Sequence, residues 1–165
     1  MYPLALFIIA VLAACIHFFI SKKKTFARFI ELSLAYMIPL NIGVATLIGF
    51  ISHAFFGPET AEQIGWPAHN PFQFEVAVGN LAMSAAGFLC IWQKKGFWLA
   101  TTIFSGIFFL GAAVGHIVQM VVHGNYSPYN SGPFLYIGDI AIPLVYLTLA
   151  LIYSAQNRFF KSFEQ

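Results

Sequence analysis

Residues 97–122 read FWLATTIFSGIFFLGAAVGHIVQMVV, a run without a single Lys, Arg, Asp or Glu. An α-helix rises about 1.5 Å per residue, so about 20 apolar residues cross the hydrocarbon core of a bilayer. This stretch is long enough, and it predicts a membrane-spanning helix. Its one ionisable side chain is His116, close to the C-terminal end of the run.

Four other apolar stretches flank this one, and together they predict an all-α integral membrane bundle of five transmembrane helices. The composition agrees, because 59% of the residues are hydrophobic and 8% are charged, whereas a soluble domain carries about 25% charged residues. The length of 165 residues predicts one domain, residues 1–165. The predicted spans are residues 2–20, 26–56, 72–92, 97–122 and 133–153.

The basic residues predict the orientation of this bundle. With five spans they all fall on one side of the membrane, and the positive-inside rule makes that side the cytoplasm. The N-terminus is then outside, the C-terminus is cytoplasmic, and the outer loops 57–71 and 123–132 contain no Lys or Arg. The basic residues are Lys22, Lys23, Lys24 and Arg28 after the first span, Lys94 and Lys95 after the third, and Arg158 and Lys161 after the fifth.

Proline and glycine positions predict local features of the helices. Pro39 lies near the middle of the long second span, where it removes a backbone donor and predicts a kink. In the fourth span, Gly111 and Gly115 form a small-residue pair of the kind that lets a neighbouring helix approach closely.

The two outer loops also carry recognisable signals. Residues 57–64 begin with Gly-Pro-Glu, which favours a short interfacial helix, and Trp66 behind it is expected at the headgroups. Residues 124–132, GNYSPYNSG, are rich in turn formers and predict a lid over the outer end of the bundle.

Polar side chains within the apolar spans are the main functional signal. An ionised side chain at the bilayer centre costs about 2.5–3.5 kcal/mol by the lower estimates, so such groups face the interior of a bundle. Depths along the helices place Asn80, His116 and Asp139 at one level, below a shallower level with Glu75, Gln119 and Tyr136. His53 lies near the outer end of its span. We therefore expect His116 and Asp139 to face each other or a shared ligand.

Two interpretations of this polar layer stay open. Glu75, His116 and Asp139, with His53 or His123, are residue types that bind iron, manganese or zinc, supported by Asn80, Gln119, Gln73 and Tyr136. The same groups could instead bind a small ligand or relay protons. In the structural interpretation, Asp139 caps a helix after Gly138, Glu75 favours a helix dipole, and His116 only hydrogen-bonds across helices. His17 and Tyr36 have no evident partners.

Two strings of the sequence carry a resemblance. Gly65-Trp66-Pro67, with Asn70-Pro71-Phe72-Gln73-Phe74-Glu75 and Asn80-Leu81, is followed by Gly111-Ala112-Ala113-Val114-Gly115-His116-Ile117-Val118-Gln119-Met120. From about residue 64 to the C-terminus the chain resembles a family of small uncharacterised bacterial membrane proteins, with a looser likeness in size and layout to small DoxX-like proteins. The resemblance implies a multi-pass protein of the bacterial inner membrane, and it implies no activity.

Three classes of function follow from these observations. The first is a protein with an outward-facing intramembrane site for a metal ion or small ligand, with no reaction indicated. The second is an accessory or assembly subunit of a larger membrane complex, whose polar residues are purely structural. The third is a proton- or ion-coupled transporter. The expected partners are the lipid bilayer and either other membrane subunits or a second copy of the chain, with no nucleic acid.

Overall fold

The computed structural model describes residues 1–161, and the protein is helical through most of this part. No segment between residues 1 and 161 forms a β-strand, so the all-α prediction is confirmed. Residues 162–165, which belong to the predicted single domain, lie outside the described part. The elements are α1 (Tyr2–Ile20), α2 (Phe26–Met37), η1 (Ile38–Val44), α3 (Ala45–Phe55), α4 (Gly57–Ile64), α5 (Phe72–Leu89), α6 (Gly96–His123), α7 (Pro128–Ser131), η2 (Phe134–Ala141) and α8 (Ile142–Lys161), where η denotes a π-helical segment.

Within residues 1–161, four helical stretches are long and apolar enough to cross a membrane. They are Tyr2–Ile20, Phe26–Phe55, Gly96–His123 and Phe134–Asn157, and they correspond to the first, second, fourth and fifth predicted spans. Helix α5 stands at the place of the third span but ends at Leu89, and it is not among the four. The polar residues of α5, among them Gln73, Glu75 and Asn80, lower the mean hydropathy of this helix. The described part thus contains four helices that are able to cross a membrane by their length and composition, and the fifth span stays a prediction.

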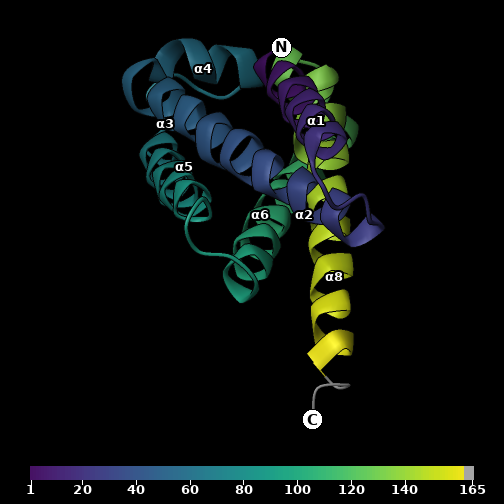
Figure 1. Ribbon diagram of the computed structural model, residues 1–165. Helices are drawn as coiled ribbons and strands as arrows, with labels where there is room; N and C mark the ends of the chain where they lie inside the picture. Colours follow the sequence, from purple (N-terminus) through teal and green to yellow (C-terminus); the bar gives the residue numbers. More distant parts are fainter. Residues whose placement is uncertain (162–165) are drawn as a thin grey trace.

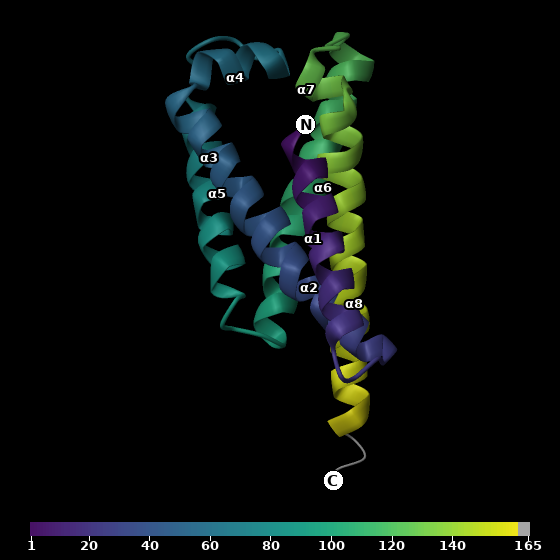
Figure 2. The same cartoon turned by 45° about the horizontal axis from the view of Figure 1, so that its top comes forward.

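The helices run side by side, with α3 and α5 on one side of the bundle and α1, α6 and α8 on the other (Figure 2). Helices α4 and α7 lie across the same end of the bundle, which we call the lid end, and the N-terminus lies near it. The opposite end carries the connections 21–25 and 90–95 and the end of α8, as Figure 1 also shows. We call it the basic end.

Glu31 on α2 joins two of the basic segments. Arg28 Nη1 lies 2.7 Å from Glu31 Oε2, and Lys94 Nζ lies 3.5 Å from Glu31 Oε1. Such partly exposed pairs contribute at most about 1 kcal/mol each to stability. They matter here because they show which segments lie close together. They place residue 94 beside the start of α2. The end of α8 lies at this same end of the bundle (Figure 2), so the three basic segments are together.

The apolar core lies between α1, α2, α6 and α8, in the middle of the bundle and toward the basic end. In lipid, helices associate through close van der Waals packing, which small residues make possible. Ala10 and Ala14 serve this purpose on α1, one turn apart and 0% and 1% exposed. The larger buried members of the core include Ile30, Leu34, Met37, Ile38, Met83, Trp98 and Tyr146.

Helix α5 is held against η1 by a glycine contact. A Cβ atom at Gly87 would lie 2.5 Å from the backbone N of Gly43, so only glycine permits this approach. Next to this contact, Ser84 Oγ donates a hydrogen bond of 2.9 Å to the carbonyl oxygen of Gly43. The pair therefore positions α5 alongside the second long helix, which the sequence pattern had not indicated.

Both π-helical segments are associated with proline. A proline ring collides with the carbonyl four residues earlier, and a wider π turn relieves this collision. Pro39 lies within η1, so the distortion predicted there takes the form of a π segment in a continuous helix. Pro143 lies two residues after the end of η2, which contains Asp139, the residue four positions before the proline.

Replacing Gly87 by alanine tests the contact between α5 and η1. We expect Gly87→Ala to lower the thermal unfolding midpoint of the detergent-purified protein, because forcing extra atoms into a packed interface costs about 1–3 kcal/mol. Gly96→Ala is the matched control, since a Cβ there meets nothing within 4 Å. Equal midpoints for the two variants would contradict the close packing.

Candidate functional site

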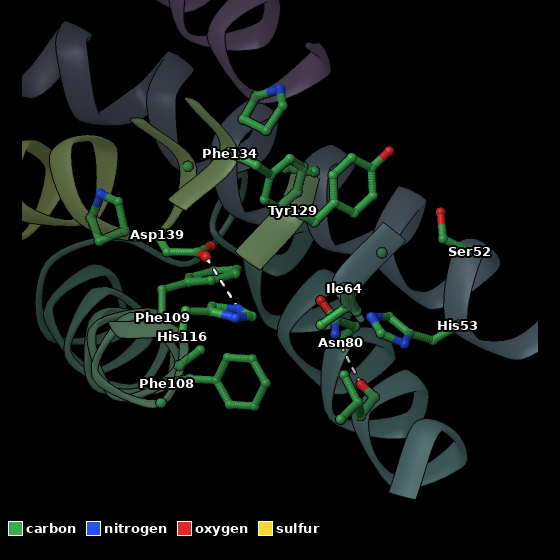
Figure 3. A pocket seen from close by; sticks show the side chains of 18 of the residues that line it. Ser52, His53, Ile64, Asn80, Phe108, Phe109, His116, Tyr129, Phe134 and Asp139 are labelled. Atoms are coloured by element: carbon green, nitrogen blue, oxygen red, sulfur yellow. Dashed lines mark hydrogen bonds and ion pairs between the residues drawn. The ribbon is translucent and has the colours of Figure 1, made fainter. Parts of the chain in front are cut away.

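A cavity of about 540 Å³ lies inside the bundle near the lid end. Its wall comes from α1, η1, α3, α5, α6, η2 and α8, and residues of α4 and α7 contribute at the lid end. Figure 3 shows His116 and Asp139 on one side of this space, with His53 and Asn80 on the other. The cavity thus separates the α3–α5 pair from α6 and η2.

The wall is largely apolar and rich in aromatic rings. The rings of Tyr129 and Phe134 stack with centroids 4.9 Å apart, and those of Phe108 and Phe109 meet edge to face at 5.6 Å. Trp66 lines the cavity, with its ring centroid 6.3 Å from that of His53, and its expected place at the headgroups stays a prediction.

Gly111 and Gly115 form part of the cavity wall on α6. A Cβ atom at either position would meet nothing within 4 Å. The close helix approach predicted at these two glycines is therefore wrong, because no neighbouring backbone packs there. Their missing side chains leave the cavity open in front of His116.

Asn130 on α7 fixes which ring nitrogen of His116 acts as a hydrogen-bond donor. Its amide Nδ2 donates to the carbonyl oxygens of Asn125 at 2.6 Å and of His116 at 3.3 Å. The amide oxygen must then face the imidazole, and Oδ1 lies 2.7 Å from Nδ1 of His116. Because an amide oxygen only accepts, Nδ1 carries the proton and donates it. In the neutral imidazole, Nε2 is left with its lone pair and acts as an acceptor.

Asp139 faces that acceptor. Its Oδ2 lies 3.8 Å from Nε2 of His116, which confirms the expectation that the two side chains face each other. The distance is too long for a hydrogen bond. Asp139 is 4% exposed, and its carboxylate makes no hydrogen bond to any of residues 1–161. It lies inside η2 rather than before a helix, so the helix-cap interpretation is wrong.

Two further polar groups of the cavity wall have no partner among residues 1–161. They are the hydroxyl of Tyr146 and the Oδ1 atom of Asn41, both buried. The amide nitrogen of Asn41 does donate, to the carbonyl oxygen of Pro3 at 3.4 Å. A buried polar group without a partner costs about 1–3 kcal/mol, so such groups are concentrated where something else binds them.

The opposite wall contains a more satisfied polar group. Gln73 donates through Nε2 to the carbonyl oxygen of Gly57 at 2.6 Å, so its Oε1 accepts from Nδ1 of His53 at 3.0 Å. Asn80 donates to the carbonyl oxygen of Val76 at 2.9 Å. These bonds hold α3, α4 and α5 together, and they leave Nε2 of His53 without a hydrogen bond to the described residues.

The structure brings some of the predicted residues together and separates others. His53, His116 and Asp139 line the cavity, as do Asn80 and Gln119, while Gln73 is buried behind His53. Glu75, His123 and Tyr136 do not line it, and all three are exposed on the outside of the described bundle. The predicted ligand set is thereby reduced to two facing residues and one histidine across the cavity.

The positions of these side chains do not support the metal interpretation. Within residues 1–161, no three His, Cys, Asp or Glu side chains come close enough together to hold a metal ion. A protein site for iron, manganese or zinc draws most of its ligands from such residues. The geometry therefore favours a ligand that uses few polar contacts over a bound metal.

Sequence reasoning missed three contributors to the site. Asn130 lies in the turn-rich stretch 124–132, where an asparagine reads as a turn residue. Asn41 stands out as an amide inside an apolar span, which is a usable signal. Tyr146 carries no such signal. His17 and Tyr36, without evident partners in the sequence, bond each other through Nδ1 and the hydroxyl at 3.0 Å.

Replacing Asn130 by alanine tests the attachment of the lid. We expect faster amide hydrogen exchange in residues 124–132 and a lower unfolding midpoint, because three hydrogen bonds of a side chain that is 0% exposed are lost. Ser131→Ala is the control on the same helix, since its hydroxyl bonds only Ser127 O of the same turn. Similar exchange in both variants would show that Asn130 does not hold the lid.

Comparison with known proteins gives a family and no activity. No curated protein and no solved structure is similar enough to this chain to match it. A family of unknown function (DUF6790) matches residues 1–159, which is nearly the whole chain and includes the first span. Because this match covers nearly the whole chain, the chain belongs to the DUF6790 family of unknown function.

Proposed function

We propose that this protein binds a small organic molecule in the cavity between α3, α5, α6 and η2, as a multi-pass protein of the bacterial inner membrane. The observation that carries the proposal is that Asp139 lines this space without a hydrogen bond to residues 1–161, as do Tyr146 and Asn41, whose buried hydroxyl and Oδ1 atoms have no partner there. The bound molecule supplies those partners. No reaction is included in the proposal.

The size and chemistry of the cavity support a small-molecule ligand. Its volume of about 540 Å³ lies in the range of about 300–1,000 Å³ that is typical of ligand pockets. Such pockets have mostly apolar walls with a few convergent polar groups. Here Phe108, Phe109 and Phe134 form apolar wall beside the pair His116 and Asp139.

The proposed topology has five spans, with the N-terminus outside and the C-terminus in the cytoplasm. Its support is the position of the three basic segments at one end of the bundle, which the positive-inside rule assigns to the cytoplasm. Helix α5 is the third span, and its 18 residues extend about 27 Å at 1.5 Å per residue. The cavity then opens toward the outer side, beneath α4 and α7.

A transport function has less support. The half of the bundle toward the basic end is filled by the apolar core around Leu34, Met37 and Trp98. A continuous polar path across the membrane would have to pass this core. The accessory-subunit function is the competing proposal, in which the polar groups around the cavity only stabilise the bundle.

The topology is tested by labelling engineered cysteines in intact cells with a membrane-impermeant maleimide. We expect Ala68→Cys in the outer loop to react, and Gln93→Cys between α5 and α6 to react only after lysis. The unaltered chain is the control for Cys15 and Cys90. A reporter after Gln165 is expected to behave as cytoplasmic. The reverse pattern would turn the cavity toward the cytoplasm.

Ligand binding is tested by extracting small molecules from the full-length protein purified in mild detergent. We expect the wild type to retain one organic molecule per chain, and Asp139→Asn to retain less than a tenth of it, because the amide keeps the shape and removes the charge. Glu75→Gln is the matched control, since that carboxylate is exposed outside the cavity.

Elemental analysis of the same samples separates the alternatives. Stoichiometric iron, manganese or zinc that Asp139→Asn loses would replace the organic-ligand function with a metal site. Wild-type protein that holds neither metal nor organic molecule, with variants that behave alike, would leave the accessory-subunit function.

A further inference from the structure

We propose that the ligand is an organic amine, whose ammonium group lies between Nε2 of His116 and the carboxylate of Asp139. This inference rests on the proposed small-molecule function and specifies the chemical class that the same cavity takes. It follows from the hydrogen-bonding pattern of the cavity, from its charge and from its aromatic wall.

The hydrogen-bonding pattern calls for a donor. Nδ1–H of His116 donates a hydrogen bond to Asn130, so Nε2 of the neutral imidazole presents a lone pair. The carboxylate oxygen that it faces, at 3.8 Å, is also an acceptor. Two facing acceptors repel each other unless one of them carries a proton or a group with N–H or O–H bonds both. A primary ammonium has three N–H donors and no acceptor, so it can bond both at once.

A third acceptor belongs to a residue of the same cavity wall. The Oδ1 atom of Asn41 is buried and has no hydrogen-bond partner among residues 1–161. Its amide nitrogen donates to Pro3, so the oxygen is the atom left for a ligand. Tyr146, also without a partner there, can accept as well as donate. A ligand that satisfies the unpaired groups of this wall must therefore supply mainly hydrogen-bond donors.

The charges of the cavity and of its surroundings favour a cation. Asp139 is the only aspartate of the chain, and neither lysine nor arginine occurs between residues 96 and 157 or between 29 and 93. Among the described residues, no lysine or arginine forms an ion pair with this carboxylate, and His116 is the basic group that faces it. Across the lid end, α4 carries the exposed residues Glu59 and Glu62. A negative entrance attracts cations and repels anions.

The aromatic wall suits both parts of such a ligand. Phe109, Phe134 and Tyr129 lie around the His116–Asp139 pair in Figure 3. Aromatic faces attract an ammonium group electrostatically. Phe108 and the open surface of Gly111 and Gly115 accommodate an apolar body. An inorganic cation would leave the apolar part of this wall without a partner, and fewer than three acidic, cysteine or histidine ligands meet at one point in residues 1–161.

Three probes of matched shape test the charge of the ligand. 2-Phenylethylamine, 2-phenylethanol and phenylacetate are titrated into the full-length protein in lipid nanodiscs, after removal of any retained molecule, and binding is followed by calorimetry. Butylamine is added to test the contribution of the ring. We expect both amines to bind, the aromatic one more tightly, and both the alcohol and the acid to bind at least tenfold more weakly.

Variants connect the binding to Asp139 and to the apolar part of the cavity. We expect Asp139→Asn to weaken amine binding at least tenfold and to leave the weak binding of the alcohol unchanged, which a general loss of structure would not do. Glu75→Gln is the control and should bind like the wild type. Gly111→Leu, which fills open space in the cavity, should weaken the aromatic amine more than butylamine.

The outcomes separate this inference from the proposed function. Equal binding of amine and alcohol, or amine binding that Asp139→Asn leaves unchanged, would overturn the amine assignment and keep a small-molecule site. So would a retained molecule that proves to be neutral or acidic. If no probe binds and the purified protein retains no organic molecule, both the amine and the proposed function fail.

Discussion

The hydrogen bond between His116 and Asn130 is the contact on which the rest of the site depends. It links α7, in the lid formed by residues 124–132, to α6, with 2.7 Å between Asn130 Oδ1 and His116 Nδ1. It also orients the imidazole toward Asp139. Asn130 in turn holds the carbonyl of Asn125, whose side chain donates to the carbonyl of Ile64 at the end of α4. One chain of hydrogen bonds thus connects α6, α7 and α4 over the cavity. If it broke, the lid would open and His116 would lose its fixed tautomer.

Glycines have two opposite effects on helix packing in this bundle. At Gly43 and Gly87 the missing side chains bring η1 and α5 into backbone contact, which fixes one wall of the cavity. At Gly111 and Gly115 the same absence leaves space, because no helix packs against that face. The bundle is therefore tight where α5 meets η1 and open where α5 would otherwise meet α6. The cavity occupies the space that is left between α5 and α6.

The π-helical segments explain how polar groups reach this cavity from apolar helices. Asn41 lies in η1 and Asp139 lies in η2, each close to a proline that disfavours a regular α-helical turn. A π turn shifts the side chains that follow it around the helix axis, and such turns are frequent at functional sites. Both segments place a polar side chain with unpaired atoms on the cavity wall.

The sequence by itself determined the properties that depend only on order along the chain. Hydropathy and length predicted the all-α class, and they located four stretches that are able to cross a membrane. Counting residues along the helices predicted that His116 and Asp139 would meet, because depth in a helix follows directly from position. The fifth span, the orientation and the use of the cavity remain predictions.

The tertiary structure alone decided how each helix is rotated and what packs against it. Glu75 has a suitable depth, yet the rotation of α5 turns it outward and turns Gln73 inward. The glycine pair of α6 faces a cavity instead of a helix, and Asn130 reaches His116 only because the lid folds back over α6. Rotation and loop path depend on the packing of distant segments. Spacing along one helix determines which residues share a face, and the neighbouring helices determine where that face points.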